Sequence, residues 1–185
     1  MNTFYTMEVG ISGNDVNKHY ITNLSMVKIY ENDGLQVDFS KQLVINFKPY
    51  GEEDKSVSNL NWFTRNNNKQ FGDTEMEAIF KINTYFPDEP VNLIQMRNEI
   101  PIEYVNKLFE RNNKQYRINN VLVLEEETKQ LLNMDIYQAL KHYNIHYNEF
   151  DTPTWAYDAA KLFVRLNEDF PGFYKETFER KEFFE

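Results

Sequence analysis

Hydrophobic and polar residues alternate over much of the first fifty residues, as they do in β-strands with one buried face. The alternation covers residues 5–11, 35–39 and 43–47, and the apolar-rich stretch 20–30 predicts another strand. Between two of these segments, Asn32-Asp33-Gly34 predicts a hairpin, because an Asp-Gly pair supplies the positive φ angles of a tight turn. The pattern therefore predicts an antiparallel β-meander of about four strands.

The first of these strands has the pattern of a half-buried one. Tyr5, Met7 and Val9 alternate with Thr6 and Glu8, so we expect the apolar set to face the core and the polar set to face solvent.

Helical signals dominate the second half of the chain. Thr74 and Glu77 have the spacing of a capping box at a helix start, and Pro101 suits the first position of a second helix. Three consecutive glutamates from Glu125 favour another helix N-terminus through the helix dipole, and a further helix is expected to begin at Thr152.

The predicted fold class is α+β, with an antiparallel N-terminal β-meander followed by a mainly helical C-terminal half. At this length we expect a single domain over residues 1–185. Its parts are a β-rich segment (1–50), a polar loop (51–72), a mixed segment (73–124) and a helical segment (125–185).

The amino-acid composition predicts that the chain folds and excludes cysteine chemistry. It carries 29 acidic and 20 basic side chains, together with 15 Phe, 12 Tyr and 2 Trp. Acidity is typical of disorder, but so many aromatic side chains offset chain entropy by burial, so a folded domain with rings to spare for a contact surface is predicted. The absence of cysteine excludes disulfides, thiolate zinc sites and a cysteine nucleophile.

No secretory leader is visible, and no apolar stretch reaches the roughly 18–20 residues that span a bilayer, so we expect a cytoplasmic protein without a membrane partner. Frequent Asn, Lys, Ile and Tyr beside scarce Ala indicate an AT-rich genome, of the kind found in low-GC bacteria and their phages.

The charge pattern supplies the leading hypothesis on function. The formal net charge is −9, which repels nucleic acid at long range and attracts basic protein surfaces, so direct binding of nucleic acid is disfavoured. The acids of the last third, Asp158 among them, fall off the apolar positions and are expected to face outward. Carboxylates one helical turn, about 5.4 Å, apart have a spacing comparable to that of phosphates along a strand.

We therefore predict an acidic inhibitor or modulator without catalytic activity, encoded by a phage or mobile element, that mimics nucleic acid. It would block the basic groove of a nucleic-acid-handling enzyme, such as a host defence nuclease, by protein–protein interaction. The predicted contact combines acids with aromatic anchors, as binding hot spots do. Its residues are Glu168, Asp169, Tyr174, Glu176, Phe178, Glu179 and Glu182.

A metal-dependent enzyme is the first alternative. His142 and His146 have the i, i+4 spacing that places two imidazoles on one helix face, and Glu149 lies close in sequence. The Glu that follows the first His in metalloprotease motifs is absent, since Tyr143 stands there. Two histidines at a helix end are the simpler interpretation, and we expect no cofactor.

A single-stranded nucleic-acid binder is the second alternative. Cations interleaved with aromatic rings hold phosphates and bases respectively, and they occur in the segments 62–71 and 107–117. The residues concerned are Arg65, Lys69, Arg111, Lys114 and Arg117. Ordinary ion pairs on a solvated helix explain them as well, since Lys107 follows Glu103 by four residues.

Other enzyme signatures are missing from the sequence. There is no serine nucleophile elbow, no phosphate-cradling glycine loop and no dinucleotide fingerprint. This favours a binding protein over an enzyme. Unpaired strand edges and surplus aromatic residues also allow a homo-oligomer.

Overall fold

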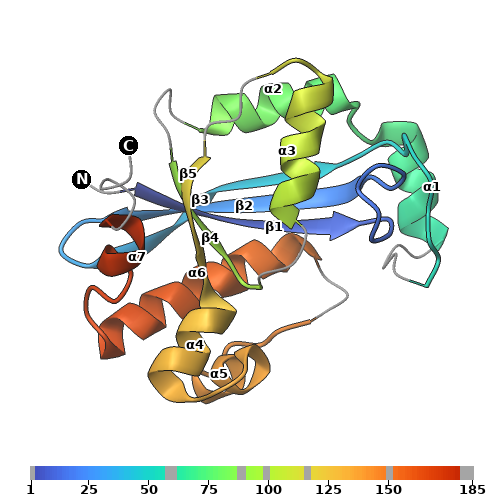
Figure 1. Cartoon of the computed structure of the whole chain (residues 1–185). Coiled ribbons are helices and arrows are strands. Elements are labelled where there is room, and N and C mark those ends of the chain that lie inside the picture. The colour runs from blue at the N-terminus through green and yellow to red at the C-terminus, as the bar shows by residue number, and fades with distance from the viewer. Residues whose placement is uncertain are drawn as a thin grey trace.

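The computed structural model describes residues 3–56, 62–86, 91–97, 101–114, 118–148 and 152–179. Within these residues, a five-stranded mixed sheet carries helices on both faces (Figure 1). The strands are β1 (Thr3–Ile11), β2 (Ile21–Glu31), β3 (Leu35–Asn46), β4 (Val91–Gln95) and β5 (Ile118–Val123). The helices are α1 (Trp62–Phe71), α2 (Glu75–Tyr85), α3 (Pro101–Arg111), α4 (Leu124–Leu132), α5 (Ile136–His142), α6 (Thr152–Asp169) and α7 (Lys175–Glu179).

Strand β1 is the central strand, in the order β3-β2-β1-β4-β5. It pairs antiparallel with β2, with Met7 opposite Met26, and parallel with β4, with Tyr5 opposite Leu93. β4 and β5 are also parallel. The α+β class is confirmed, but the predicted antiparallel meander of about four strands is wrong. β3 is one strand over both segments predicted as separate, and the later strands join the sheet in parallel through crossovers.

Local turn and cap chemistry appears where the sequence predicts it. The hairpin between β2 and β3 has positive φ at Asp33 (51°) and Gly34 (123°). Thr74 and Glu77 form both hydrogen bonds of a capping box before α2. Pro101 is the first residue of α3. These short-range predictions are confirmed because each depends on a few neighbouring residues.

Helices cover both faces of the sheet, so β1 is buried on both sides. Tyr5 and Met7 pack with residues of α2 and α3, whereas Phe4 packs with residues of α4 to α7. Figure 1 shows the two layers, with α2 and α3 on one side of the strands and α4, α5, α6 and α7 on the other. The expectation that the polar residues of β1 face solvent is wrong, since Thr6 is 0% and Glu8 7% exposed.

The predicted polar loop 51–72 contains helix α1, which its low apolar content did not predict. The helical segment after Glu125 is divided by Asn133, which caps α4 with left-handed φ of 55°. Over the part of the chain described, no helix is both long and apolar enough to cross a bilayer.

Replacing Phe4 tests the core between the sheet and α6. Its ring lies 5.6 Å from the ring of Phe163 and 5.0 Å from that of Tyr174. We expect Phe4→Ala to lower the free energy of unfolding by about 3–5 kcal/mol, because it leaves a cavity between aromatic rings. Urea unfolding measures this loss. Phe71→Ala, at a ring 76% exposed, is the control and should change the unfolding free energy by less than about 1 kcal/mol; equal losses in both variants would contradict the packing described.

Candidate functional site

The parallel strand β4 ends beside the middle of β1, the central strand of the sheet, since Ile94 lies opposite Thr6 and β4 ends at Gln95. Helix α6 packs against β1 and β2 on one face, and α3 contacts β1 on the other. Carboxyl ends of parallel strands are where α/β sheets commonly bind ligands. Buried acidic side chains at this place are therefore candidates for function.

Glu8 is the first of these acids. It lies near the carboxyl end of β1, and its Oε1 atom accepts a hydrogen bond of 2.6 Å from the backbone N–H of Met96, just beyond β4. Burial raises the pKa of the Glu8 carboxyl to about 7, although the Met96 N–H and the positive charge of Arg97 act in the opposite direction. Glu8 is therefore a buried carboxyl that changes its charge near neutral pH.

Asp158 is the second. It lies in α6, is 2% exposed, and its Oδ1 atom is 3.2 Å from the ammonium group of Lys161, one turn later. The expectation that Asp158 faces outward is wrong, because α6 buries this side against the sheet.

A hydrogen bond fixes α6 to β1 between these acids. The Thr6 hydroxyl donates to the carbonyl of Ala156 at 2.7 Å. Glu8 lies two residues from Thr6 on the same face of β1, about 7 Å along the strand. Asp158 lies two residues from Ala156 on α6, about 3 Å along its axis. Both carboxylates therefore lie on the α6 side of the sheet. Each is two residues from the hydrogen bond that joins Thr6 of β1 to Ala156 of α6.

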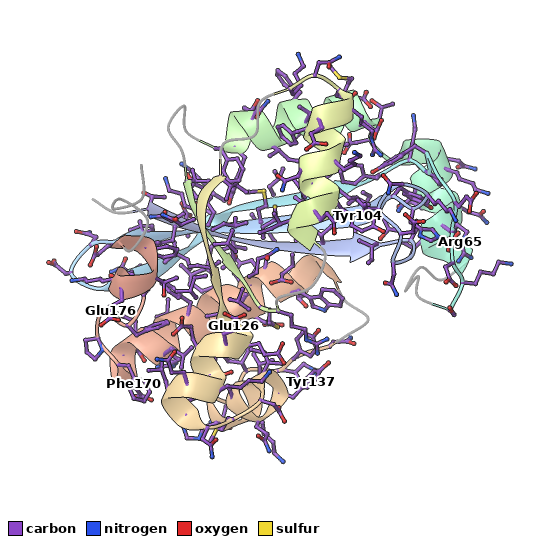
Figure 2. The ribbon with its side chains drawn as sticks, viewed as in Figure 1. Arg65, Tyr104, Glu126, Tyr137, Phe170 and Glu176 are labelled. Atoms are coloured by element: carbon purple, nitrogen blue, oxygen red, sulfur yellow. The ribbon has the colours of Figure 1, made fainter. Side chains whose placement is uncertain are left out.

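Aromatic and basic side chains adjoin this pair. The guanidinium of Arg97, which follows β4, lies 4.5 Å from the ring centroid of Tyr137 on α5. Tyr137 is labelled in Figure 2, below the sheet on the side of α5 and α6. Trp155 precedes Asp158 by one turn on α6.

The carboxylate oxygens of Glu8 and Asp158 are possible ligands of a divalent cation. No cluster of three or more acidic or histidine side chains placed to hold a metal occurs among the described residues. Glu8 and Asp158 nevertheless offer carboxylate oxygens, the ligands of Mg²⁺, which is often held by one or two carboxylates with waters and substrate phosphate. Two carboxylates are the number that one such ion needs, and they are too few for a two-metal site.

Of the residues predicted to bind a protein partner, those that the structure describes lie at the C-terminal end of α6 and in the segment that follows it, where Figure 2 labels Glu176. Tyr174 is 3% exposed, and Phe178 stacks on Phe4 with ring centroids 5.6 Å apart, so both belong to the core rather than to a surface. Glu168 pairs with Arg165 at 2.7 Å.

Asp169 accepts a hydrogen bond of 2.7 Å from the Tyr143 hydroxyl. Glu176 is exposed on α7. The side chain of Glu179, and Glu182 altogether, lie outside the described residues. The acidic set therefore includes side chains that are already engaged within the chain.

Two of the basic residues of the nucleic-acid alternative are already engaged in ion pairs within the chain. Arg65 forms a bidentate ion pair with Glu53. Arg111 forms an ion pair with Glu75, and its guanidinium lies 4.5 Å from the ring centroid of Tyr50. Lys69 is exposed on α1, and Lys114 is exposed just after the end of α3. Arg117 lies outside the described residues. Figure 2 shows Arg65 by α1, beyond the right-hand end of the strands, and Tyr137 below the sheet.

The histidine pair does not share a helix face. Helix α5 ends at His142, and Asn144 has left-handed φ of 55°. His146 therefore follows a chain reversal, so the i, i+4 geometry that the alternative requires is absent. Glu149 lies outside the described residues.

Sequence analysis missed Glu8 and Asp158 for a common reason. Glu8 alternates with apolar neighbours and Asp158 falls off the apolar positions of its helix, so both patterns indicate solvent exposure, whereas both faces of β1 and the inner side of α6 are covered.

Comparisons with known proteins place this fold. No protein-family model matches the sequence, and no curated protein matches it significantly. The nuclease domain of 3'hExo, described as a DEDDh family member bound to rAMP, has a TM-score of 0.71 at 11% identity, covering 91% of this chain and 92% of that one. The zinc-bound complex of E. coli ExoI with ssDNA has a TM-score of 0.75 at 13% identity, covering 92% and 41%.

A structure of exonuclease I that suggests how processivity is achieved has a TM-score of 0.71 at 11% identity. The chain spans about two fifths of the exonuclease I chains it matches. At such low identity these likenesses show the fold, which is that of exonuclease domains.

This finding corrects the functional expectation. The prediction of an acidic, nucleic-acid-mimicking inhibitor is wrong, because the fold is shared with enzymes that act on nucleic acid. The expectation that direct contact with nucleic acid is disfavoured is contradicted as well, since the similar ExoI structure is a complex with ssDNA.

The raised pKa of Glu8 makes stability depend on pH. Because this pKa is higher in the folded than in the unfolded chain, the contribution of protonated Glu8 is present below about pH 4.5 and is lost as pH rises through about 7. We expect Glu8→Gln to remove this loss. Relative to the unaltered protein, the variant should gain about 3 kcal/mol of unfolding free energy between pH 4.5 and pH 8, since one pKa unit corresponds to about 1.4 kcal/mol.

Urea unfolding at both pH values measures the difference. Glu110→Gln, at an exposed carboxyl of α3, controls for the change in net charge and should leave the pH dependence intact. Identical pH profiles for Glu8→Gln and the unaltered protein would contradict the burial of an ionisable Glu8.

Proposed function

We propose that the chain binds the end of a single-stranded nucleic acid where β4 ends beside β1 and hydrolyses its phosphodiester with a divalent cation. The observation that carries this proposal is the buried pair Glu8 and Asp158, on adjoining elements of an exonuclease fold. Buried carboxyls with perturbed pKa values concentrate at functional sites.

Each residue of the pair has a defined part. Glu8 and Asp158 would hold the cation, which supplies polarisation of the phosphate and a more acidic water. Glu8 must lose its proton to do so, and the Met96 N–H keeps its carboxylate oriented. Arg97 carries a positive charge beside Glu8 and suits a phosphate oxygen.

The net charge of −9 does not conflict with a polyanionic substrate at this site. On helix α6, Glu168 follows Asp158 by ten residues, about 15 Å along the helix axis. That separation is about two Debye lengths at physiological ionic strength, where the Debye length is about 8 Å. Local cations therefore dominate the field that a bound strand experiences.

Binding of a strand without cleavage is a second candidate function. Two observations favour it: the described residues hold no cluster of three or more acidic or histidine side chains for a metal, and the Thr6 hydroxyl beside Glu8 is already donated to Ala156. The same assay separates the two functions.

The test measures release of nucleotides from a fluorescent single strand in Mg²⁺ or Mn²⁺. We expect cleavage that stops with chelator and rises as pH passes through about 7, where Glu8 deprotonates. Glu8→Gln and Asp158→Asn should each lower the rate at least about a hundredfold, since even indirect partners of a metal ligand are worth about 10–100-fold.

Strand affinity in chelator should change little in both variants, and Glu110→Gln should cleave like the unaltered protein. Cleavage that persists in both variants would contradict the assignment of Glu8 and Asp158 as ligands of the cation. Tight binding with no cleavage in either metal would identify the second candidate function.

A further inference from the structure

A row of aromatic side chains adjoins the carboxylate pair. The rings of Tyr137 and Tyr147 lie 5.7 Å apart at 64°, and the Tyr147 ring is stacked on that of Trp155 at 6.0 Å and 26°. The Trp155 indole N–H donates to the carbonyl of Asn148 at 2.8 Å, which fixes the orientation of the indole. Tyr137 is 47% exposed, and the other two rings are partly exposed.

Cations gather around this row on a molecule that is otherwise anionic. The Arg97 guanidinium lies over the Tyr137 ring at 4.5 Å. Lys141 lines a shallow hollow of about 400 Å³ together with Tyr137 and Tyr147. Rings and positive charge are thus interleaved within one small surface.

The row also leads to the carboxylates. Arg97 lies close enough to Glu8 for its positive charge to lower the pKa of that carboxyl, and its guanidinium lies over the ring of Tyr137. Trp155, at the other end of the row, lies one helical turn before Asp158. A chain lying along the rings would therefore reach the buried acids without leaving this face of the molecule.

We propose that Tyr137, Tyr147 and Trp155 form a base-stacking surface for single-stranded nucleic acid, with Arg97 and Lys141 contacting its phosphates. This inference rests on the proposed function, because it names how the same site holds its substrate. Aromatic rings stack on any base, and neighbouring cations hold the backbone, so the surface selects unpaired bases and tolerates any sequence. A duplex hides the faces of its bases and would not use the rings.

The experiment is a titration of a fluorescent oligothymidylate in chelator, so that binding is read without cleavage. Tyr137→Ala and Trp155→Ala should each weaken affinity about tenfold or more, the loss expected for one stacked base. Phe80→Ala is the matched control, because this ring is 72% exposed on α2, across the sheet. Its affinity should equal that of the unaltered protein.

A second measurement does not depend on truncating the row. In a Trp62→Phe background, Trp155 is the remaining tryptophan, and stacking of a base should quench its emission. An abasic strand of the same length keeps every phosphate, so it should bind more weakly and leave the emission unchanged.

The outcomes separate the surface from the proposed function. Affinities of Tyr137→Ala and Trp155→Ala equal to that of Phe80→Ala, with no quenching, overturn the stacking surface, whereas metal-dependent cleavage by the unaltered protein would still stand. Failure of the unaltered protein to bind any single strand overturns the surface and the proposed function together.

Discussion

Burial of β1 on both faces is the constraint on which the rest of the structure depends. A central strand between two helical layers has no solvent side, so its polar side chains must find partners inside the protein. Thr6 does so by donating to Ala156 of α6, and Glu8 by accepting from the N–H of Met96. The carbonyl of Met96 in turn accepts from the N–H of Glu125 at 3.0 Å, at the start of α4. The polar groups that attach the helices to the sheet therefore also create a buried acidic position beside β4.

The parts of the fold that the sequence predicts are those set by near neighbours. The capping box at Thr74, the turn at Asp33-Gly34 and the start of α3 at Pro101 each depend on a few adjacent residues. The place of β4 depends on parallel pairing with a strand almost ninety residues earlier, so local alternation carries no record of it. Helix α1 is polar, and its apolar pattern is too weak to distinguish it from a loop.

The site follows the same division. Glu8 alternates with apolar residues, and Asp158 lies among charged positions of a helix, so both patterns indicate solvent exposure. Their burial is a property of the layers that cover β1 and α6, which are built from the whole chain. Tyr174 shows the converse, because a ring expected at the surface packs on Phe4 in the core. Composition counts the aromatic residues correctly but does not divide them between core and surface.

The end of helix α5 explains how rings far apart along the chain come to lie together. Its last turn closes with hydrogen bonds from the Asn144 N–H to the Lys141 carbonyl and from the Ile145 N–H to the Leu140 carbonyl, with Asn144 in the left-handed conformation. Had the helix continued, Tyr137 and Tyr147 would be separated by about 15 Å along its axis. The reversal instead returns the chain so that their rings are 5.7 Å apart. The same reversal removes His142 and His146 from a common helix face. The local event that rules out a helical histidine pair is therefore the one that assembles the aromatic row.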